Sequence, residues 1–241
     1  DFCIKPALVL HFYSLESEIT LATVYEWVIM VSKQIQLDTW ERKAHYQFFT
    51  SSSGSVRLSL TQPLDVTGLV TYCKLHSLSF YYSLIFLVTQ TANDMPGFRQ
   101  RIEKDEPIEH DSLHPLFTDL NLRKNDERFK LVMGQMRNEL VDFVEATKQQ
   151  SLAQKEHLPV ADFIERQDIL HITCYPWGDF SSMQVKPVQT SNQDAGIPFI
   201  AWGQYQKKSF KQGERYMLSL QLDVSHCFLD AIHLYQFKTK L

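Results

Sequence analysis

The chain has 241 residues, a formal net charge of −4, 44% hydrophobic residues and 22% charged residues. This balance is typical of a soluble globular protein, and it lacks the basic footprint that nucleic-acid binding requires. Its longest apolar runs, such as residues 84–88, are too short to cross a bilayer. We therefore expect neither a nucleic-acid partner nor a membrane partner.

The four cysteines are scattered along the chain and form no CxxC pair. This usage favours a reducing, cytoplasmic location over a disulfide framework or a zinc knuckle. The N-terminus has no pattern of basic, apolar and small residues, so we expect no signal peptide.

Residues 1–35 differ in character from the rest of the chain. An apolar run over residues 6–13 is followed by helical spacing of apolar residues over 18–33. We interpret this part as an N-terminal extension of uncertain role, which is either an accessory helix covering the domain or a partner, or a segment without a part in the chemistry. The remainder, residues 36–241, is predicted to be a single domain.

Between residues 36 and 154, the pattern predicts helices interspersed with strands. The expected elements are a helix over 40–49, a strand over 56–61 ended by Pro63, a helix over 65–73 capped by Asp65 or Thr67, a buried helix over 79–93, strands over 98–102 and 116–122, and a long charged helix over 125–154. The charges of this last helix indicate a solvated face rather than a binding patch.

The C-terminal part is predicted to be mainly strands. Apolar strands are expected over 170–175 and 198–205, and a turn containing Lys207, Lys208, Gln212 and Gly213 leads into a hairpin partner over 216–224. Because helices and strands are interspersed and the last strands are neighbours, the chain favours a mixed sheet with helices packed on one side.

The last predicted strand runs directly into His226, and Asp230 follows four residues later. Histidine titrates near neutral pH, so an imidazole held rigidly at the end of a strand can act as a general base. The spacing alone is equally compatible with a capped or buried histidine followed by an ordinary turn aspartate.

Several collinear segments resemble the type A chloramphenicol acetyltransferases. They are WERKAHY at 40–46, FY at 80–81, NDMPGFRQRI at 93–102, DSLHPLFT at 111–118, LHITCYPW at 170–177 and VSHCFLD at 224–230. The resemblance covers about residues 36–237. It implies a two-layer α/β sandwich, in which helices pack on a mixed, largely antiparallel sheet. It also implies a homotrimer whose active sites lie at the subunit interfaces.

The resemblance also implies roles for individual residues. His226 falls on the catalytic base, which removes a proton from the acceptor hydroxyl while that hydroxyl attacks acetyl-CoA directly. Thr173 falls on a serine whose hydroxyl steadies the oxyanion. Arg42 and Asp230 fall on a structural ion pair that supports the site. The implied reaction is O-acetylation of chloramphenicol with acetyl-CoA as co-substrate and without a metal.

The substrate pocket departs from the family pattern. Phe49 and Met183 replace a tyrosine and a phenylalanine, His171 replaces an asparagine, and Leu58 completes the residues that we expect to distinguish acceptors. Further departures are Ser225 for the first motif histidine, Ala231 for a glycine and Ala201 for a threonine. Two alternatives therefore stay open: a same-fold acyltransferase with a different acceptor, and a catalytically impaired homologue.

Two rival kinds of site deserve comparison with this interpretation. His226, Asp230 and His233 would share one face of a helix and could bind zinc, and His110 with His114 forms a second HxxxH pair. Cys174 or Cys227 could act as a nucleophile, although a small buried cysteine is the commoner state.

Overall fold

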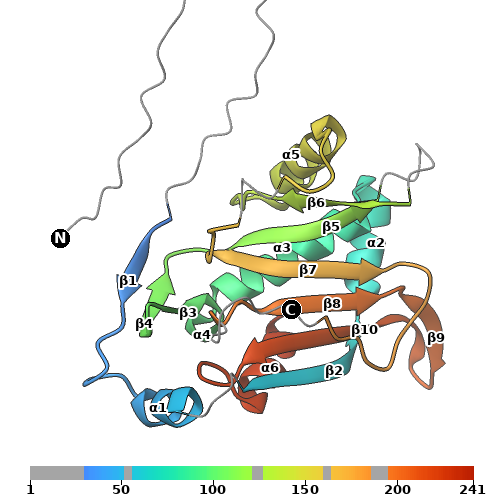
Figure 1. Ribbon diagram of the computed structural model, residues 1–241. Helices are drawn as coiled ribbons and strands as arrows, with labels where there is room; N and C mark the ends of the chain where they lie inside the picture. Colours follow the sequence, from blue (N-terminus) through green and yellow to red (C-terminus); the bar gives the residue numbers. More distant parts are fainter. Residues whose placement is uncertain (1–29, 52–55, 121–126, 160–163, 186–194) are drawn as a thin grey trace, which may run out of the picture.

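A computed structural model describes residues 30–51, 56–120, 127–159, 164–185 and 195–241. Its described part forms two sheets, and helices gather on one side of the larger sheet (Figure 1). The predicted two-layer α/β architecture is thereby confirmed.

The larger sheet has seven strands. Their order is β2 (Arg57–Asp65), β10 (Gly213–Ser225), β8 (Phe199–Gly203), β7 (Ile169–Tyr175), β5 (His114–Leu120) and β6 (Phe129–Met133), with β9 (Gln206–Phe210) paired to β10. β7 runs parallel to both β5 and β8, and the other pairs are antiparallel. The sheet is therefore mixed and largely antiparallel, as predicted. A smaller sheet that the sequence analysis did not predict has the order β1 (Ser32–Gln34), β4 (Glu106–His110) and β3 (Gln100–Glu103).

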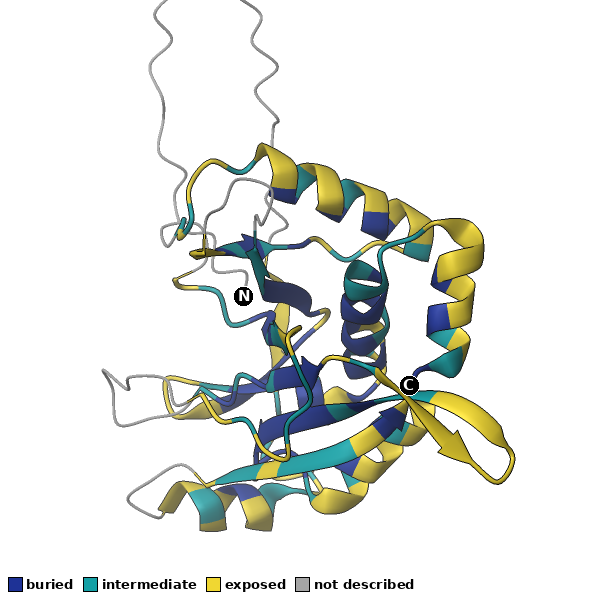
Figure 2. Cartoon of the chain, turned by 90° about the vertical axis from the view of Figure 1, so that its right-hand side faces the viewer, coloured by how far each residue is buried: buried dark blue, intermediate teal, exposed yellow. Residues whose placement is uncertain are grey.

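A buried helix, α3 (Phe80–Asn93), is at the centre of the helical layer. It contacts α2 (Thr67–His76), α5 (Leu140–Ala153) and α6 (Ala231–Lys240), and α4 (Pro96–Arg99) follows it directly. Ser79 caps α3, because its side chain accepts a hydrogen bond from the backbone N–H of Tyr82. Figure 2 shows the dark, buried residues where helices and sheet face each other. The predicted buried helix over 79–93 is confirmed.

Strand β10 extends the apolar core of the sheet to the residue before His226. Its alternate residues Leu218, Leu220, Leu222 and Val224 belong to the main apolar cluster, together with Leu234 and Phe237 of α6. Because side chains alternate along a strand, Gln221, Asp223 and Ser225 point to the opposite face. The strand is thus held on both faces up to its last residue, Ser225.

The long helix expected over 125–154 is wrong in its first half. Residues 129–133 form β6, which pairs antiparallel with β5, and α5 begins only at Leu140. Lys130 made this stretch look like a solvated helix face, but its amino group is buried and donates to the carbonyl and hydroxyl oxygens of Ser151. Because Ser151 satisfies this amino group, a lysine can occupy a buried position in the strand.

The predicted end of β2 at Pro63 is also wrong, because the strand continues to Asp65. Among the described residues, β2 pairs only with β10 and is an edge strand, so the missing N–H of Pro63 costs no ladder bond. The helix expected over 65–73 is α2, which begins at Thr67 with Val66 as its N-cap residue, so the predicted cap at Asp65 or Thr67 is wrong. The Asp65 carboxylate instead accepts the Thr67 N–H at 2.9 Å.

Smaller differences concern element boundaries. The strand expected over 98–102 is split between α4 and β3, because Pro96 starts a short helix. Lys207 and Lys208 lie in β9 rather than in the hairpin turn. The helix expected over 40–49 is α1, which spans Lys43–Ser51.

The N-terminal expectation falls mostly outside the described residues. Of the helix expected over 18–33, residues 18–29 are not described, whereas Ser32 and Lys33 lie in β1 and pair with His110 and Glu109. Residues 32–34 thus join the smaller sheet.

Candidate active site

The loop that carries His226 is fixed at both ends. β10 ends at Ser225, and the His226 N–H donates to the Val56 carbonyl oxygen at 2.9 Å. The next three residues, 227–229, are each only 2% exposed, and α6 begins at Ala231. Burial of these apolar side chains anchors the loop, so its short connection presents the imidazole in one place.

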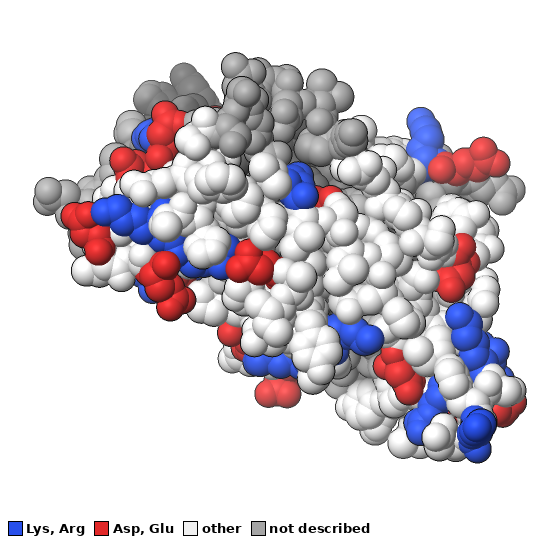
Figure 3. Space-filling view, turned by 90° about the horizontal axis from the view of Figure 1, so that it is seen from below, with Lys and Arg blue, Asp and Glu red and all other residues white. Residues whose placement is uncertain are grey.

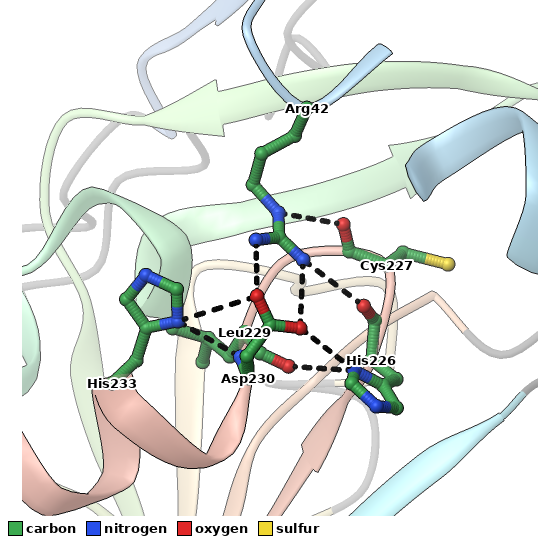
Figure 4. A network of polar contacts seen from close by, with 6 residues as sticks. All are labelled: Arg42, His226, Cys227, Leu229, Asp230 and His233. Atoms are coloured by element: carbon green, nitrogen blue, oxygen red, sulfur yellow. Dashed lines mark hydrogen bonds and ion pairs between the residues drawn. The ribbon is translucent and has the colours of Figure 1, made fainter. Parts of the chain in front are cut away.

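The His226 ring has defined neighbours. Nδ1 forms a hydrogen bond of 3.1 Å with the Leu229 carbonyl oxygen, and Asp230 Oδ1 also lies 3.1 Å from Nδ1 (Figure 4). Phe49 of α1 stacks on the ring, with 4.5 Å between centroids and 18° between planes. A carbonyl oxygen can only accept, so Nδ1 carries the proton and Nε2 keeps its lone pair. This tautomer is the one that a general base requires.

Arg42 and Asp230 meet directly beneath this loop. Arg42 Nη1 donates to Asp230 Oδ2 at 2.7 Å, and Nη2 donates to Oδ1 at 3.3 Å. The same guanidinium reaches the carbonyl oxygens of Cys227, from Nε at 3.1 Å, and of His226, from Nη2 at 3.3 Å. The hydrogen bond from Arg42 holds the pKa of the Asp230 carboxyl below its ordinary value. The structure therefore brings together the pair that the sequence analysis named.

Thr173 lies in another part of the sheet. It is next to Ala201 of β8, which in turn pairs with Gln221, five residues before His226. Two strand spacings of about 4.8 Å and five residues of about 3.4 Å place Thr173 roughly 20 Å from His226 within one chain. A single chain therefore does not bring the predicted oxyanion hydroxyl to the predicted base.

The hydroxyl of Thr173 has a partner that sequence reasoning missed. Its Oγ1 lies 2.8 Å from Thr118 Oγ1 on the neighbouring strand β5. Thr118 ends the DSLHPLFT segment, which was the signal that could have identified it. The pair can orient the Thr173 hydroxyl, since either oxygen can donate.

The four predicted pocket residues are also dispersed. Phe49 lies on His226, whereas Leu58 of β2 packs against the main apolar cluster. His171 lies on β7 between Leu116 and Phe199, and burial, with a smaller contribution from Arg101, lowers its pKa to about 4. Met183 lies half-buried in the connection between β7 and β8. Only Phe49 of the four contacts the imidazole directly in the described contacts of this chain.

The three motif departures have different consequences. Ala231 replaces a glycine without strain, because it is the first helical residue of α6 and has no positive φ. Ser225 Oγ is buried without a hydrogen-bond partner among the described residues. Ala201 is fully buried beside Thr173 and supplies no hydroxyl there.

The rival sites gain no support from the geometry. His226 precedes α6, so it cannot share a helical face with His233, and His110 and His114 lie on different strands. No group of three metal-ligating side chains is found among the residues that the structure describes. Burial raises the pKa of the Cys174 thiol to about 12, and Cys227 is only 2% exposed. Neither thiol is poised as a nucleophile.

The surface charges are mixed on the face seen from below. Figure 3 shows Lys and Arg interspersed with Asp and Glu around a largely uncharged centre. Elsewhere among the described residues, opposite charges also pair at exposed positions, as between Lys207 and Glu214 at 2.5 Å and between Lys43 and Asp38 at 2.7 Å. Within the described ranges, every helix is too short or too polar to span a membrane.

Comparison with known proteins places this geometry in a family. The family model for chloramphenicol acetyltransferase matches residues 30–241. Chloramphenicol acetyltransferase 2 of Escherichia coli is 27% identical over 208 residues, covering 85% of this chain and 92% of the relative. A chloramphenicol acetyltransferase of Staphylococcus aureus is 26% identical over 203 residues, covering 83% and 89%.

Solved structures share the fold at lower identity. A chloramphenicol acetyltransferase superposes with a TM-score of 0.68 at 20% identity, covering 88% of this chain and 96% of that one. A dihydrolipoamide acetyltransferase of Azotobacter vinelandii gives a TM-score of 0.55 at 13% identity, covering 82% and 83%. Because the family model matches the chain from the first described residue to the last, the chain belongs to the chloramphenicol acetyltransferase family and is an acyltransferase.

Proposed function

We propose that this protein transfers the acetyl group of acetyl-CoA to a hydroxyl of chloramphenicol, and so inactivates the antibiotic. The observation that carries the proposal is the hydrogen bond between His226 Nδ1 and the Leu229 carbonyl oxygen, from which we infer that Nε2 is left as the base. The names of the curated relatives support the acceptor, and the family match supports acyl transfer.

The proposed reaction needs no covalent enzyme intermediate. His226 Nε2 takes the proton of the acceptor hydroxyl while its oxygen bonds to the thioester carbonyl carbon. As the tetrahedral intermediate collapses, the carbon–sulfur bond breaks and the imidazolium returns the proton to the CoA thiolate. The Arg42–Asp230 pair and the buried loop keep the imidazole in position throughout.

The proposed stabiliser of the oxyanion is the Thr173 hydroxyl of a second chain. Within one chain, the sheet holds Thr173 and His226 roughly 20 Å apart, so neither can complete the site alone. A homotrimer, in which each His226 faces Thr173 of its neighbour across the interface, supplies both groups. In this arrangement residues 36–241 act as one catalytic domain.

The acceptor is the finer part of the proposal. Phe49, His171 and Met183 replace the residue types found at these positions in the family, and Phe49 brings an apolar ring against the base. An altered wall of this kind changes which alcohol fits, so an acyltransferase with another acceptor is the second candidate function.

The test is a thiol-release assay with purified protein and acetyl-CoA, with and without chloramphenicol. Wild-type protein should release CoA in a chloramphenicol-dependent manner, and His226→Gln should lose at least about 10²-fold in rate. His76→Gln, which changes an exposed histidine at the end of α2, is the matched control and should keep full activity. Release with another alcohol but not with chloramphenicol would favour the second candidate. Full activity in His226→Gln would contradict the mechanism, and no release with any acceptor would indicate an impaired homologue.

A further inference from the structure

One peptide group joins His226 to a second histidine. The Leu229 carbonyl oxygen contacts His226 Nδ1 at 3.1 Å, and the N–H of the same peptide, on Asp230, donates to His233 Nδ1 at 2.8 Å (Figure 4). A peptide group is planar and conjugated, so its N–H and C=O are oriented as one rigid unit. Fixing the N–H at one end therefore fixes the carbonyl at the other.

The two contacts determine the protons of both rings. The backbone N–H can only donate, so His233 Nδ1 has a free lone pair and its proton is on Nε2. The carbonyl can only accept, so the His226 proton is on Nδ1. Hydrogen bonds in a chain polarise one another, and an N–H that is already bonded makes its carbonyl a better acceptor. His233 therefore strengthens the bond that selects the His226 tautomer.

We propose that His233 is a positioning residue for the catalytic base. It holds the Leu229–Asp230 peptide so that the carbonyl keeps His226 in the Nδ1–H form. This proposal rests on the proposed function only for the statement that His226 is the base. His233 Nδ1 contacts Asp230 twice, at the backbone N–H and, at 3.9 Å, at the carboxylate, and His233 acts through the peptide.

A purely structural helix cap is distinguishable from this role. Asp230 is the N-cap residue of α6, and the His233 backbone N–H donates to its backbone carbonyl oxygen at 2.9 Å, a bond that does not need the imidazole. The imidazole supplies the reciprocal bond, which in capping boxes usually comes from Glu or Gln. Asp230 Oδ1, held by Arg42, lies 3.1 Å from His226 Nδ1 and also accepts from it, so it supports the same tautomer as the Leu229 carbonyl. Loss of His233 should weaken only the Leu229 carbonyl's share of the tautomer preference, without unfolding the site.

The experiment compares His233→Ala with His233→Gln in the full chain labelled with nitrogen-15 at histidine. NMR correlation of ring nitrogens with ring protons reports the His226 tautomer without any substrate, and His226→Gln assigns its signals. In the wild type we expect the Nδ1–H form. In His233→Ala the Nε2–H form should rise to a measurable fraction, whereas Gln, which offers an acceptor oxygen, should restore the wild-type spectrum.

Kinetics give the second readout. For His233→Ala, kcat should fall by about three- to tenfold while KM for acetyl-CoA stays within about twofold, and Gln should recover most of the loss. An unchanged tautomer and kcat in His233→Ala would overturn the proposal, as would a Gln variant that is folded but as impaired as Ala. If no acceptor is turned over, the proposed function fails while the NMR result still decides the role of His233.

Discussion

At the scale of single residues, the site depends on how Arg42 is bonded. One guanidinium reaches both oxygens of Asp230 and the carbonyl oxygens of Cys227 and His226. The rigid fork of Arg suits this arrangement, whereas a lysine ammonium is a single point charge on a flexible stem. The residue therefore binds the loop itself as well as its aspartate.

Replacing Arg42 with Lys should thus fail to preserve the site. We expect Arg42→Lys to lose about 1–3 kcal/mol in the free energy of unfolding, because buried acceptors are left unpaired. It should also lose at least about tenfold in kcat/KM, because the loop no longer aims His226. Urea unfolding and the thiol-release assay measure the two effects.

The matched control is the neighbouring Lys43, whose ion pair with Asp38 is exposed. Lys43→Ala should change the free energy of unfolding by less than about 1 kcal/mol, since exposed pairs contribute little. If Arg42→Lys changed the free energy of unfolding as little as this control, a positive charge at position 42 would be sufficient to hold the loop, contrary to the prediction.

At the scale of elements, the catalytic loop is supported by α4. A Cβ added at Gly97 would lie 2.6 Å from Leu229 Cδ2 and 2.9 Å from the Phe228 carbonyl oxygen. The second atom belongs to the backbone, so it cannot move without moving the loop. Gly97 thus allows the close approach of α4 to the segment that follows His226.

The prediction is that Gly97→Ala displaces the loop. We expect a loss of about 1–3 kcal/mol in the free energy of unfolding from overpacking, together with reduced kcat. Gly68→Ala in α2 is the control, because a Cβ there meets nothing within 4 Å. It should stabilise the protein by up to about 1 kcal/mol, since Ala is a better helix former. Thermal unfolding and activity assays compare the two variants. Equal stability and activity in Gly97→Ala and Gly68→Ala would contradict the argument from the close approach of α4 to the loop.

At the scale of the whole molecule, the proposed site needs two chains. If the site is shared, Thr173→Ala and His226→Gln should each be nearly inactive. Each variant removes one of the two groups, from opposite chains, at every interface. The two variants are co-expressed with separate tags and purified as mixed trimers. About one interface in four then combines an intact His226 with an intact Thr173, so the mixture should recover about a quarter of wild-type activity.

Two controls define the result of this mixing experiment. Wild-type chains mixed with the Thr173→Ala/His226→Gln double variant show whether subunits assemble at random. Sedimentation or gel filtration tests whether the chain forms the proposed trimer. A mixture that assembles randomly but recovers no activity would place both residues in one chain's site, contrary to the register of the sheet.

Buried histidines make the stability of the whole molecule sensitive to pH. His110 is 3% exposed, and its two ring nitrogens have no hydrogen-bond partner among the described residues. Burial, and after it the charge of Arg101, lowers the pKa of His110 to about 4. The unfolded chain, with a histidine pKa near 6.5, therefore binds more protons than the folded chain between these two values.

The sign of the effect follows from this difference. The contribution of His110 to stability is fully present above about pH 6.5 and is lost as the pH falls towards 4. Urea unfolding at pH 7.5 and pH 5 should show the decrease, and His110→Phe should make it smaller because the buried ring no longer titrates. An equally steep pH dependence in that variant would exclude His110 as a source.

The sequence by itself determined the features that local patterns and motif chemistry encode. The alternation of β10, the buried helix α3 and the order of the family motifs were all predicted from the residues. The pairing of Arg42 with Asp230 was predicted because the resemblance supplied a contact across 188 residues. Spacing alone would not have given it.

Only the tertiary structure decided the features that depend on burial and register. Lys130 became part of a strand because Ser151, from a distant helix, satisfies its amino group. Pro63 stayed in β2 because that strand lies at an edge. Sheet register separated Thr173 from His226, and the Leu229–Asp230 peptide connected His226 to His233. Sequence patterns report each residue's own preferences, whereas these outcomes depend on which partner the fold brings within hydrogen-bonding distance.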